Sequence, residues 1–275
     1  MPERKEHWSA GDLYEPYVGR WSRKVALEFL AWLRVPAHAQ WLDVGCGTGA
    51  LTQAVLRAAQ PASVLGIDSS PAFIDFAQAF TPDARARYEV GDAQALSLAA
   101  HSVDIAVSGL MVNFVPQPEA ALAEMARVVR PGGCVAIYVW DYVEGMELMR
   151  YFWTAAVELN PKALDSDEGK RFQMCRPEPL KALFEQAGLA HVEVRLLEVP
   201  TPFRDFDDYW SPFLGGQGPA PGYAMALSEA ERVRLRERIR EALPHRPDGS
   251  IELHARAWGV RGYSNATAQA VADVQ

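Results

Sequence analysis

Cysteine is scarce in this chain, with three among 275 residues, at positions Cys46, Cys134 and Cys175. They lie far apart and form no C-x-x-C pair. An odd number of widely spaced cysteines argues against a disulfide framework or a zinc site, and it fits a reducing compartment. The six histidines also lack a metal-binding spacing such as H-x-x-x-H, so the sequence predicts no metal ion.

Long apolar runs and an excess of basic residues are also missing. No run of about 18 apolar residues occurs, and the polar N-terminal stretch lacks the apolar segment of a secretory signal. Acidic residues outnumber basic ones, 35 to 27, which gives a formal charge of −8. Such a charge provides no general attraction to nucleic acid or anionic lipid. We therefore expect a cytoplasmic protein with neither a membrane nor a nucleic-acid partner.

The residues that are present follow a regular pattern between positions 40 and 140. Apolar runs that predict strands alternate there with patterns that predict helices. The strands cover 40–44, 63–67, 86–90, 103–107 and 134–140, and the helices cover about 50–59, the residues after Pro71, and 118–129, the last ended by Arg-Pro-Gly-Gly at 130–133. This alternation predicts a parallel sheet with helices on both faces.

The rest of the chain departs from this rhythm. It predicts a helix over about 144–158, a polar loop to Arg176, a helix over 177–188, a strand over 191–199, a charged helix over 228–243 and a strand over 250–259. The segment between the last strand but one and the charged helix is rich in proline, glycine and aromatic residues. We expect it to fold over a substrate crevice.

The segment most informative about function is Asp43-Val-Gly-Cys-Gly-Thr-Gly49, between the first strand and its helix. Its glycines allow a tight turn and a close approach to a ligand, and the helix behind directs N–H groups at the same place. In open parallel sheets, ligands bind at the carboxyl ends of the strands. Gly45, Gly47 and Ala50, with Asp68 about 20 residues further on, also satisfy the dinucleotide pattern G-x-G-x-x-[GA]. The loop alone is therefore also compatible with NAD(P) as the cofactor.

Acidic residues at successive strand ends favour a different cofactor. Asp43 lies two residues before the first glycine, and Asp92 follows the third strand. The chain here resembles the class I S-adenosylmethionine (SAM)-dependent methyltransferases, in particular the small-molecule, type 11 group related to quinone-biosynthesis methyltransferases. The resemblance rests on five ordered motifs: the D-x-G-x-G-x-G loop at 43–49, Gly66-Ile-Asp-Ser69, Gly91-Asp-Ala93, Val103-Asp-Ile-Ala-Val-Ser108 and Glu124-Met-Ala-Arg-Val-Val-Arg-Pro-Gly-Gly133.

The resemblance implies a Rossmann-like, doubly wound, seven-stranded α/β sheet, mostly parallel with the last strand antiparallel. It also implies a cofactor site at the strand ends. Gly45 and Gly47 are expected under the methionine part of SAM, with Asp43 holding its amino group directly or through water. The other members expected are Asp68 at the ribose hydroxyls, Asp92 and the backbone of Ala93 at the adenine, Ser108 and Gly109 near the methyl-donating end, and Cys46 and Ser69 beside them. For each acid the alternative is a helix N-cap or a turn residue.

Residues that shape the acceptor site are less clearly marked, because methyl transfer from a sulfonium depends mainly on alignment. Four residues precede the first strand: Tyr14, Tyr17, Arg20 and Trp21. We hypothesise that they close the SAM site, with Arg20 facing the carboxylate of SAM. The alternative is that they pack within an N-terminal helix. The candidate bases are His7, Tyr14, Asp141 and Tyr142. The candidate substrate-binding residues are Tyr17, Trp140, Tyr209 and Trp210. For Trp140, Asp141 and Tyr142 the alternative is a turn residue and core aromatics. For Tyr209 and Trp210 it is a cap that packs its own small core.

The sequence therefore predicts a SAM-dependent methyltransferase acting on a small, apolar or aromatic acceptor. Two alternatives stay open: an NAD(P)-dependent Rossmann oxidoreductase and a non-catalytic SAM-binding regulatory protein. Either a monomer or a homodimer is compatible with the sequence. We expect one domain over 1–275, with its core at 36–140, 177–199 and 250–263, cap elements at 1–35, 141–176 and 200–245, and a flexible tail at 264–275.

Overall fold

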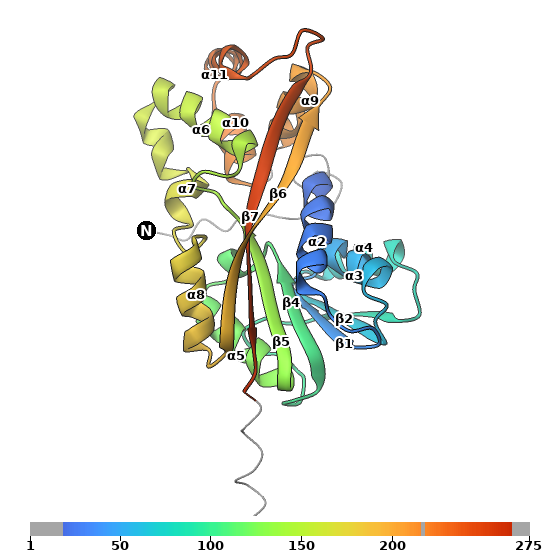
Figure 1. The fold of residues 1–275 in the computed structure, drawn as a ribbon. Helices are drawn as coiled ribbons and strands as arrows, with labels where there is room; N and C mark the ends of the chain where they lie inside the picture. Colours follow the sequence, from blue (N-terminus) through green and yellow to red (C-terminus); the bar gives the residue numbers. More distant parts are fainter. Residues whose placement is uncertain (1–18, 216–217, 266–275) are drawn as a thin grey trace, which may run out of the picture. The chain divides into compact units, whose positions relative to one another are not determined.

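A seven-stranded sheet with the order β3-β2-β1-β4-β5-β7-β6 organises the part of the chain that the computed structural model describes, residues 19–215 and 218–265 (Figure 1). The strands are β1 (Gln40–Val44), β2 (Ser63–Asp68), β3 (Ala86–Val90), β4 (Val103–Gly109), β5 (Val129–Trp140), β6 (Ala190–Phe203) and β7 (Ile251–Tyr263). The order reverses at β1 and β4, where a doubly wound sheet opens a ligand crevice.

The sheet is mostly parallel. Strands β1 to β5 all pair in parallel with their neighbours, with Asp43 of β1 opposite Gly66 of β2 and Val107 of β4. Strand β7 runs the other way along β5, because Ser264 bonds to Gly132 and Gly133 at the start of β5, whereas the carbonyl of Arg256 accepts from Asp141 just after its end. The predicted seven-stranded fold with an antiparallel last strand is confirmed.

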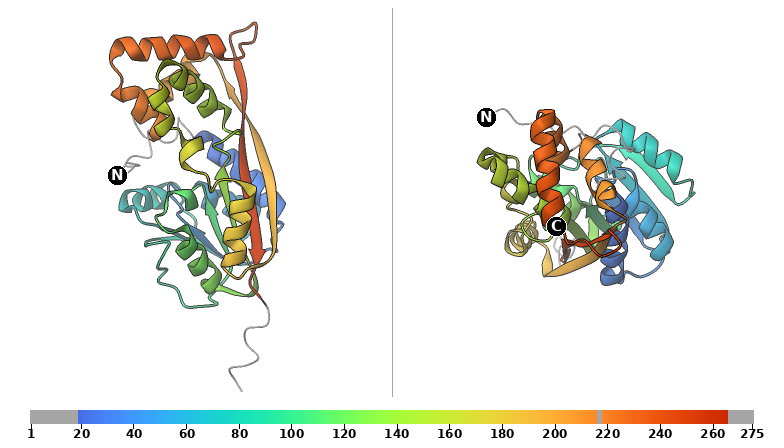
Figure 2. Two further views of the ribbon diagram at one scale, coloured as in Figure 1. Left: turned by 90° about the vertical axis from the view of Figure 1, so that its left-hand side faces the viewer. Right: turned by 90° about the horizontal axis from the view of Figure 1, so that it is seen from above.

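The chain divides into two compact units. Among the described residues, unit 1 comprises 19–21, 140–173, 198–215 and 218–257, and unit 2 comprises 22–139, 174–197 and 258–265. The long strands β6 and β7, which run side by side in Figure 2, each contribute residues to both units. The predicted cap segments 141–176 and 200–245 fall almost entirely in unit 1, whereas 22–35 belongs to unit 2. The prediction of a single domain stays a prediction.

The helices of unit 2 cover its strands (Figure 1). They are most of α2 (Arg20–Leu33), with α3 (Ala50–Ala58), α4 (Pro71–Phe80), the 3-10 turn η2 (Val112–Phe114), α5 (Pro118–Val128) and α8 (Pro177–Gln186). Helix α3 packs against β2, α4 against β2 and β3, and α5 against β4 and α8. The predicted start of α4 is confirmed, since Ser70 Oγ accepts from Phe73 N and Pro71 occupies the first helical position.

The core of unit 2 lies on its central strands. Residues 41–44 of β1 and 105–108 of β4 are all buried, as expected for strands covered on both faces. Strand β3, at the edge of the sheet, buries only Tyr88. The polar residues buried in the centre, Asp43 and Ser108, therefore stand out from an apolar environment.

Unit 1 is built from helices that pack through aromatic side chains. Its elements are α6 (Glu147–Leu159), η3 (Pro161–Asp165), α7 (Glu168–Arg171), α9 (Phe206–Trp210), η4 (Ser211–Gly215), α10 (Pro219–Ala226) and α11 (Glu229–Ala242). Phe213 stacks on Phe152 with 4.7 Å between ring centroids, and Tyr223 meets Trp153 at 5.5 Å. The charged helix α11 begins with a capping box between Ser228 and Glu231.

Several predicted boundaries were wrong. Residues 130–133 belong to β5 and not to a turn, because Val129 pairs with Val103 across a β-bulge before regular pairing resumes at Cys134. Helix α6 begins only at Glu147, because a turn precedes it in which the backbone carbonyl of Asp141 accepts from Gly145 N and Met146 N. The expected polar loop contains η3 and α7, and β6 and β7 run about four residues further than predicted.

The chain end and the helices bear on two further expectations. Ser264, placed in the expected flexible tail, is hydrogen-bonded to β5, and residues 266–275 lie outside the described part. Among the described helices, none combines the length and the apolarity that crossing a bilayer requires.

Candidate functional site

The glycine loop after β1 forms a tight turn at the carboxyl end of the sheet. Gly45, Gly47 and Gly49 all have left-handed φ angles, of 71°, 52° and 85°. The backbone N–H groups of Gly45 and Cys46 both donate to the carbonyl of Ile67, at 2.7 and 3.0 Å. The loop is thereby fastened to the end of β2, next to the start of α3.

The surroundings of two of these glycines differ. A Cβ at Gly45 would overlap the side chain of Met111, which lies directly against the loop. At Gly47, no atom of the described chain other than those of the adjoining residues lies within 4 Å of such a Cβ. Gly45 is therefore required for packing as well as for its backbone angle, whereas Gly47 leaves open space above the loop.

Asp43 is a carboxyl group with one unsatisfied oxygen. The residue is fully buried, and its Oδ2 accepts from Thr52 Oγ1 at 2.7 Å. Within residues 19–215 and 218–265, Oδ1 has no hydrogen-bond partner. Burial raises the pKa of Asp43 to about 7 against the opposing effect of Thr52. A buried polar atom without a partner carries a penalty that a bound donor, above all a cation, would relieve.

Asp68, at the end of β2, connects two backbone segments. Its Oδ2 accepts from Gly47 N and its Oδ1 from Ser70 N, both at 2.9 Å. Burial raises the pKa of this carboxyl, against the effect of these backbone hydrogen bonds. Each oxygen keeps a further lone pair, so Asp68 can still accept from a ligand hydroxyl. The adjacent Ser69 is exposed.

Asp92 lies after β3 and is exposed. Its Oδ1 accepts from Gln94 N at 2.8 Å, which is the turn role considered as the alternative for this acid. Ala93, between the two, is partly exposed. A turn residue of this kind keeps acceptor capacity for a ligand, so its structural role does not conflict with the predicted one.

The end of β4 completes this row of strand ends. Ser108 is buried and its hydroxyl has no hydrogen-bond partner in the described ranges, while Gly109 provides room for the hydroxyl end of Tyr138. The next residue, Leu110, has a left-handed φ of 61°. Such a conformation is unfavourable for leucine, and strained backbone is often found beside functional sites.

Cys46 contributes its backbone rather than its thiol. Its side chain is 6% exposed and lies next to Gly66, and burial raises the pKa of the thiol well above its ordinary value. A buried protonated thiol is not a nucleophile. Cys46 is thus a small residue that fits a crowded turn.

In unit 1, the residues predicted after β5 are buried and engaged. Asp141 forms an ion pair with Arg256 at 3.2 Å and accepts from Glu144 N. Tyr142 packs its ring against Phe172 at 5.1 Å, and Trp140 is 2% exposed. These contacts match the alternative of turn and core residues, and their catalytic or substrate-binding roles stay predictions.

The other predicted residues of unit 1 are engaged with neighbours in the same unit. Arg20 pairs with Asp208 at 3.3 Å and lies over the rings of Trp21 and Phe203. Tyr209 is fully buried and donates its hydroxyl to the carbonyl of Leu148 at 2.7 Å. Arg20 thus has a protein carboxylate where a SAM carboxylate was hypothesised.

Trp210 belongs to the same aromatic core. It is 5% exposed and lies 5.9 Å from Phe213, centroid to centroid. The described part of segment 203–223 therefore has the features of a cap with a small core of its own. His7, Tyr14 and Tyr17 lie outside the described residues.

Unit 1 also holds a buried carboxyl that the sequence analysis missed. Glu168 is 1% exposed, and its Oε2 accepts from the indole N–H of Trp153. Next to it, Asp167 forms a two-point ion pair with Arg150. Burial raises the pKa of Glu168 to about 7, against the hydrogen bond from Trp153.

This raised pKa predicts a pH-dependent stability. Between its ordinary pKa of 4.5 and about 7, folded Glu168 keeps a proton that the unfolded chain releases, so stability falls as pH rises through this window. We expect Glu168→Gln to reduce the loss of unfolding free energy between pH 5 and pH 8 by about 2–3 kcal/mol. Urea unfolding at both pH values measures it, with exposed Glu241→Gln as the control. An unchanged pH slope in Glu168→Gln would contradict the assignment.

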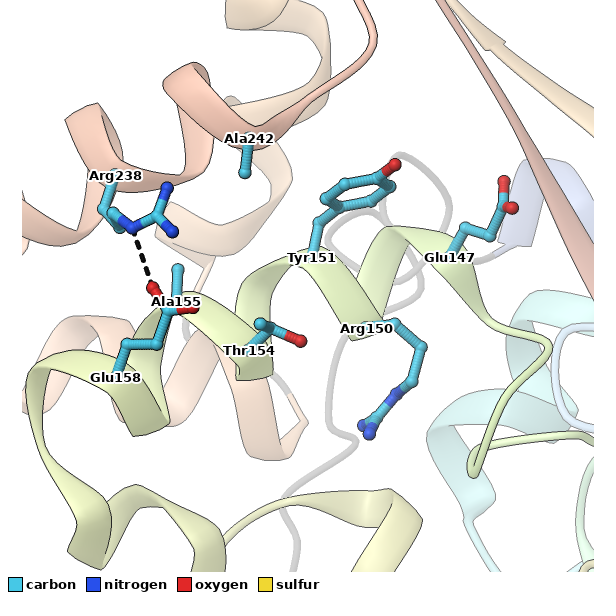
Figure 3. A pocket seen from close by; sticks show the side chains of 8 residues that line it. All are labelled: Glu147, Arg150, Tyr151, Thr154, Ala155, Glu158, Arg238 and Ala242. Carbon is cyan, nitrogen blue, oxygen red and sulfur yellow. Dashed lines mark hydrogen bonds and ion pairs between the residues drawn. The ribbon is translucent and has the colours of Figure 1, made fainter.

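A pocket of about 300 Å³ lies in unit 1 between α6 and α11 (Figure 3). It is lined by Glu147, Arg150, Tyr151, Thr154, Ala155, Glu158, Arg238 and Ala242. Both arginines are ion-paired, Arg238 with Glu158 at 2.7 Å and Arg150 with Asp167. Because these charges are neutralised locally, we assign the pocket no ligand.

Metal-binding chemistry finds no support in the part of the chain that is described. In residues 19–215 and 218–265, no three histidine, cysteine, aspartate or glutamate side chains are placed to hold a metal ion. The three cysteines are all buried and unlinked.

Three residues near the strand ends were not predicted from the sequence. Thr52 bonds to Asp43, Met111 packs on Gly45, and Asn113 is buried just after β4. The signal for Asn113 was present, since it is a polar residue within the apolar run Leu110-Met-Val-Asn-Phe-Val115. Nothing in the sequence marks Met111, because its partner Gly45 is distant in the chain, and the bond from Thr52 to Asp43, nine residues earlier, depends on how the loop between them folds.

Comparisons with known proteins find methyltransferases among the similar sequences. Residues 42–137 match the sequence profile of a methyltransferase domain family. The chain is 33% identical over 141 residues to a malonyl-[acyl-carrier protein] O-methyltransferase of Methylococcus capsulatus, a match covering 50% of this chain and 51% of that protein. It is 28% identical over 228 residues to a 2-methyl-6-phytyl-1,4-hydroquinone methyltransferase of Synechocystis, covering 78% of this chain and 69% of that one.

The same fold occurs in solved structures. The chain superposes on phosphoethanolamine N-methyltransferase 2 of Haemonchus contortus, in complex with S-adenosylhomocysteine, with a TM-score of 0.57 at 15% identity, over 92% of this chain and 56% of that one. The chain spans about half the length of the M. capsulatus relative. The sheet order and the glycine loop agree with the family match, which identifies residues 42–137 as a methyltransferase domain of the class I, type 11 group.

Proposed function

We propose that this protein transfers the methyl group of SAM to a small-molecule acceptor. The observation that carries the proposal is the unsatisfied, buried Oδ1 of Asp43 beside the glycine loop of a methyltransferase domain. A cationic ammonium group is the kind of donor that would compensate a buried carboxylate. SAM carries such a group at its methionine end.

The row of strand ends supports a place for each part of the cofactor. We propose that Gly45 and Gly47 lie under the methionine, where the open space above Gly47 leaves room. Asp68 would accept from the ribose hydroxyls with its remaining lone pairs. Asp92, with the backbone of Ala93, would bind the adenine. Strands β3, β2 and β1 are successive neighbours in the sheet. One extended ligand that lies across their carboxyl ends could therefore make all of these contacts.

The chemistry requires little from acidic or basic side chains. Bound SAM supplies an electrophilic methyl group on a positively charged sulfur. Asp43, Asp68 and the glycine loop would hold SAM, and bound there it would supply the methyl carbon to a lone pair of the acceptor, with S-adenosylhomocysteine as the leaving product. The protein's contribution is to align the two reactants and to exclude water. A base is needed only if the acceptor must lose a proton.

The dinucleotide alternative is less well supported by the fold. A dinucleotide-binding Rossmann sheet has the strand order 3-2-1-4-5-6, whereas here the antiparallel β7 is inserted between β5 and β6. We expect titration calorimetry to detect binding of SAM and S-adenosylhomocysteine and no heat with NAD(P) or NAD(P)H. Binding of a nicotinamide dinucleotide without SAM binding would overturn the proposal.

The acceptor's identity is a separate part of the proposal. The names of the relatives above include a carrier-protein-bound malonyl group and a hydroquinone, so acceptors in this group vary widely. We retain a small, apolar or aromatic acceptor as the proposed class. A panel assay for release of S-adenosylhomocysteine tests catalysis, and SAM binding without turnover on any acceptor would favour the non-catalytic, regulatory alternative.

A further inference from the structure

Asn113 is a buried amide whose hydrogen-bonding groups are unused. It lies in η2, directly after β4, and is 7% exposed. Neither its Nδ2 nor its Oδ1 has a hydrogen-bond partner in the described part of the chain. Other amides behave differently, since Gln53 bonds to Thr81 and Gln78 to the carbonyl of Tyr88. A buried amide with two donors and an acceptor left unpaired is unfavourable, so its position suggests a ligand that pairs with it.

The sheet order indicates which part of a ligand lies nearest to Asn113. Strand β4 is the neighbour of β1 on the side away from β2. A cofactor whose ribose is at Asp68 on β2 and whose methionine is over Gly45 on β1 therefore extends toward β4. The residues after β4 adjoin this place, because Met111 lies against Gly45.

The amide matches the chemistry of that end of the cofactor. An α-amino acid group carries a carboxylate, which accepts hydrogen bonds, and an ammonium, which donates them. Nδ2 of Asn113 can donate to the carboxylate, and Oδ1 can accept from the ammonium together with Oδ1 of Asp43. We infer that Asn113 binds the amino-acid end of the cofactor, an inference that rests on the proposed function.

The test compares two ligands that differ only at this end of the molecule. S-adenosylhomocysteine has the amino-acid group, and 5′-methylthioadenosine lacks it. We expect Asn113→Leu to weaken binding of S-adenosylhomocysteine by about tenfold or more, as for the loss of a hydrogen bond to a charged group, and to leave methylthioadenosine binding unchanged. Calorimetry on the full chain measures both affinities.

A thermal melt separates this role from a structural one. Leucine has nearly the shape of asparagine and removes the unpaired amide, so we expect the ligand-free variant to melt at the same or a higher temperature. The exposed Gln186→Leu makes the same chemical change on α8 and should alter neither affinity. A lower melting temperature together with equal weakening of both ligands would show a merely structural role and overturn the inference.

The remaining outcomes separate the inference from the proposed function. If the unmodified protein fails to bind S-adenosylhomocysteine, the proposed function is wrong and the inference is wrong with it. If the unmodified protein binds and Asn113→Leu binds equally tightly, the inference alone is wrong.

Discussion

Asp43→Asn is expected to lower the affinity for S-adenosylhomocysteine by about a hundredfold at pH 8, since a hydrogen-bonded charge pair is lost from a buried site. The side chain keeps its shape and can still accept from Thr52, so the fold should be retained. The interaction removed is the proposed one between the charged Oδ1 and the ligand's ammonium group. Titration calorimetry gives the difference directly.

The same variant should remove a pH dependence. Because burial raises the pKa of Asp43 to about 7, the Asp43 carboxyl of the ligand-free protein is largely protonated below neutral pH. A ligand that needs the carboxylate must then displace this proton, so affinity falls by up to about tenfold per pH unit below 7 and levels off above it. The unmodified protein should therefore bind about ten times more tightly at pH 8 than at pH 6.

Two controls make this prediction specific. Exposed Asp75→Asn, on α4, changes the net charge equally and should leave affinity and pH profile unchanged. Calorimetry in buffers of different ionisation enthalpy should show proton release on binding near pH 6, and Asp43→Asn should abolish it. Wild-type affinity with an intact pH profile in Asp43→Asn would exclude the proposed contact.

Gly45→Ala and Gly47→Ala are expected to fail in different ways. At Gly45, alanine meets both a left-handed φ of 71° and the side chain of Met111, so we expect a loss of unfolding free energy of about 3 kcal/mol. At Gly47 only the backbone angle is unfavourable, and the loss should be about 1 kcal/mol. The added methyl group would occupy the open space above the loop and weaken S-adenosylhomocysteine binding at least tenfold.

Urea unfolding and calorimetry on the two variants separate packing from binding. The double variant Gly45→Ala/Met111→Ala should recover part of the stability lost in Gly45→Ala alone, because it removes the overlap and keeps the backbone strain. Equal stability losses at the two glycines, or intact binding in Gly47→Ala, would contradict this division of roles.

The sequence was informative where structure depends on neighbours along the chain. Strand β1 and the Ser70-Pro71 start of α4 were predicted to the residue, because apolar runs and helix caps are local signals. The row of Asp43, Asp68 and Asp92 also followed from local motifs, since parallel strands end on the same side of a sheet. What these acids would bind came from the resemblance to a family.

Features that depend on distant contacts were beyond the sequence. The Arg-Pro-Gly-Gly segment looked like a turn, yet it forms the first part of β5 and is held there by hydrogen bonds with Ser264. The aromatic side chains Tyr209 and Trp210 looked equally suited to a pocket and to a core, and only their burial in the structure distinguishes the two. The unpaired amide of Asn113 became visible only once its surroundings were known.

The two hydrogen bonds that Asp68 accepts from Gly47 and Ser70 have a consequence for kinetics. They fix the loop and the carboxylate before any ligand arrives, so ordering this part of the chain is not a step of association. The conformational entropy of the loop is lost when the protein folds, so it does not oppose complex formation. Variants of the loop that remain folded should then associate at similar rates and differ mainly in residence time, which stopped-flow measurements can resolve.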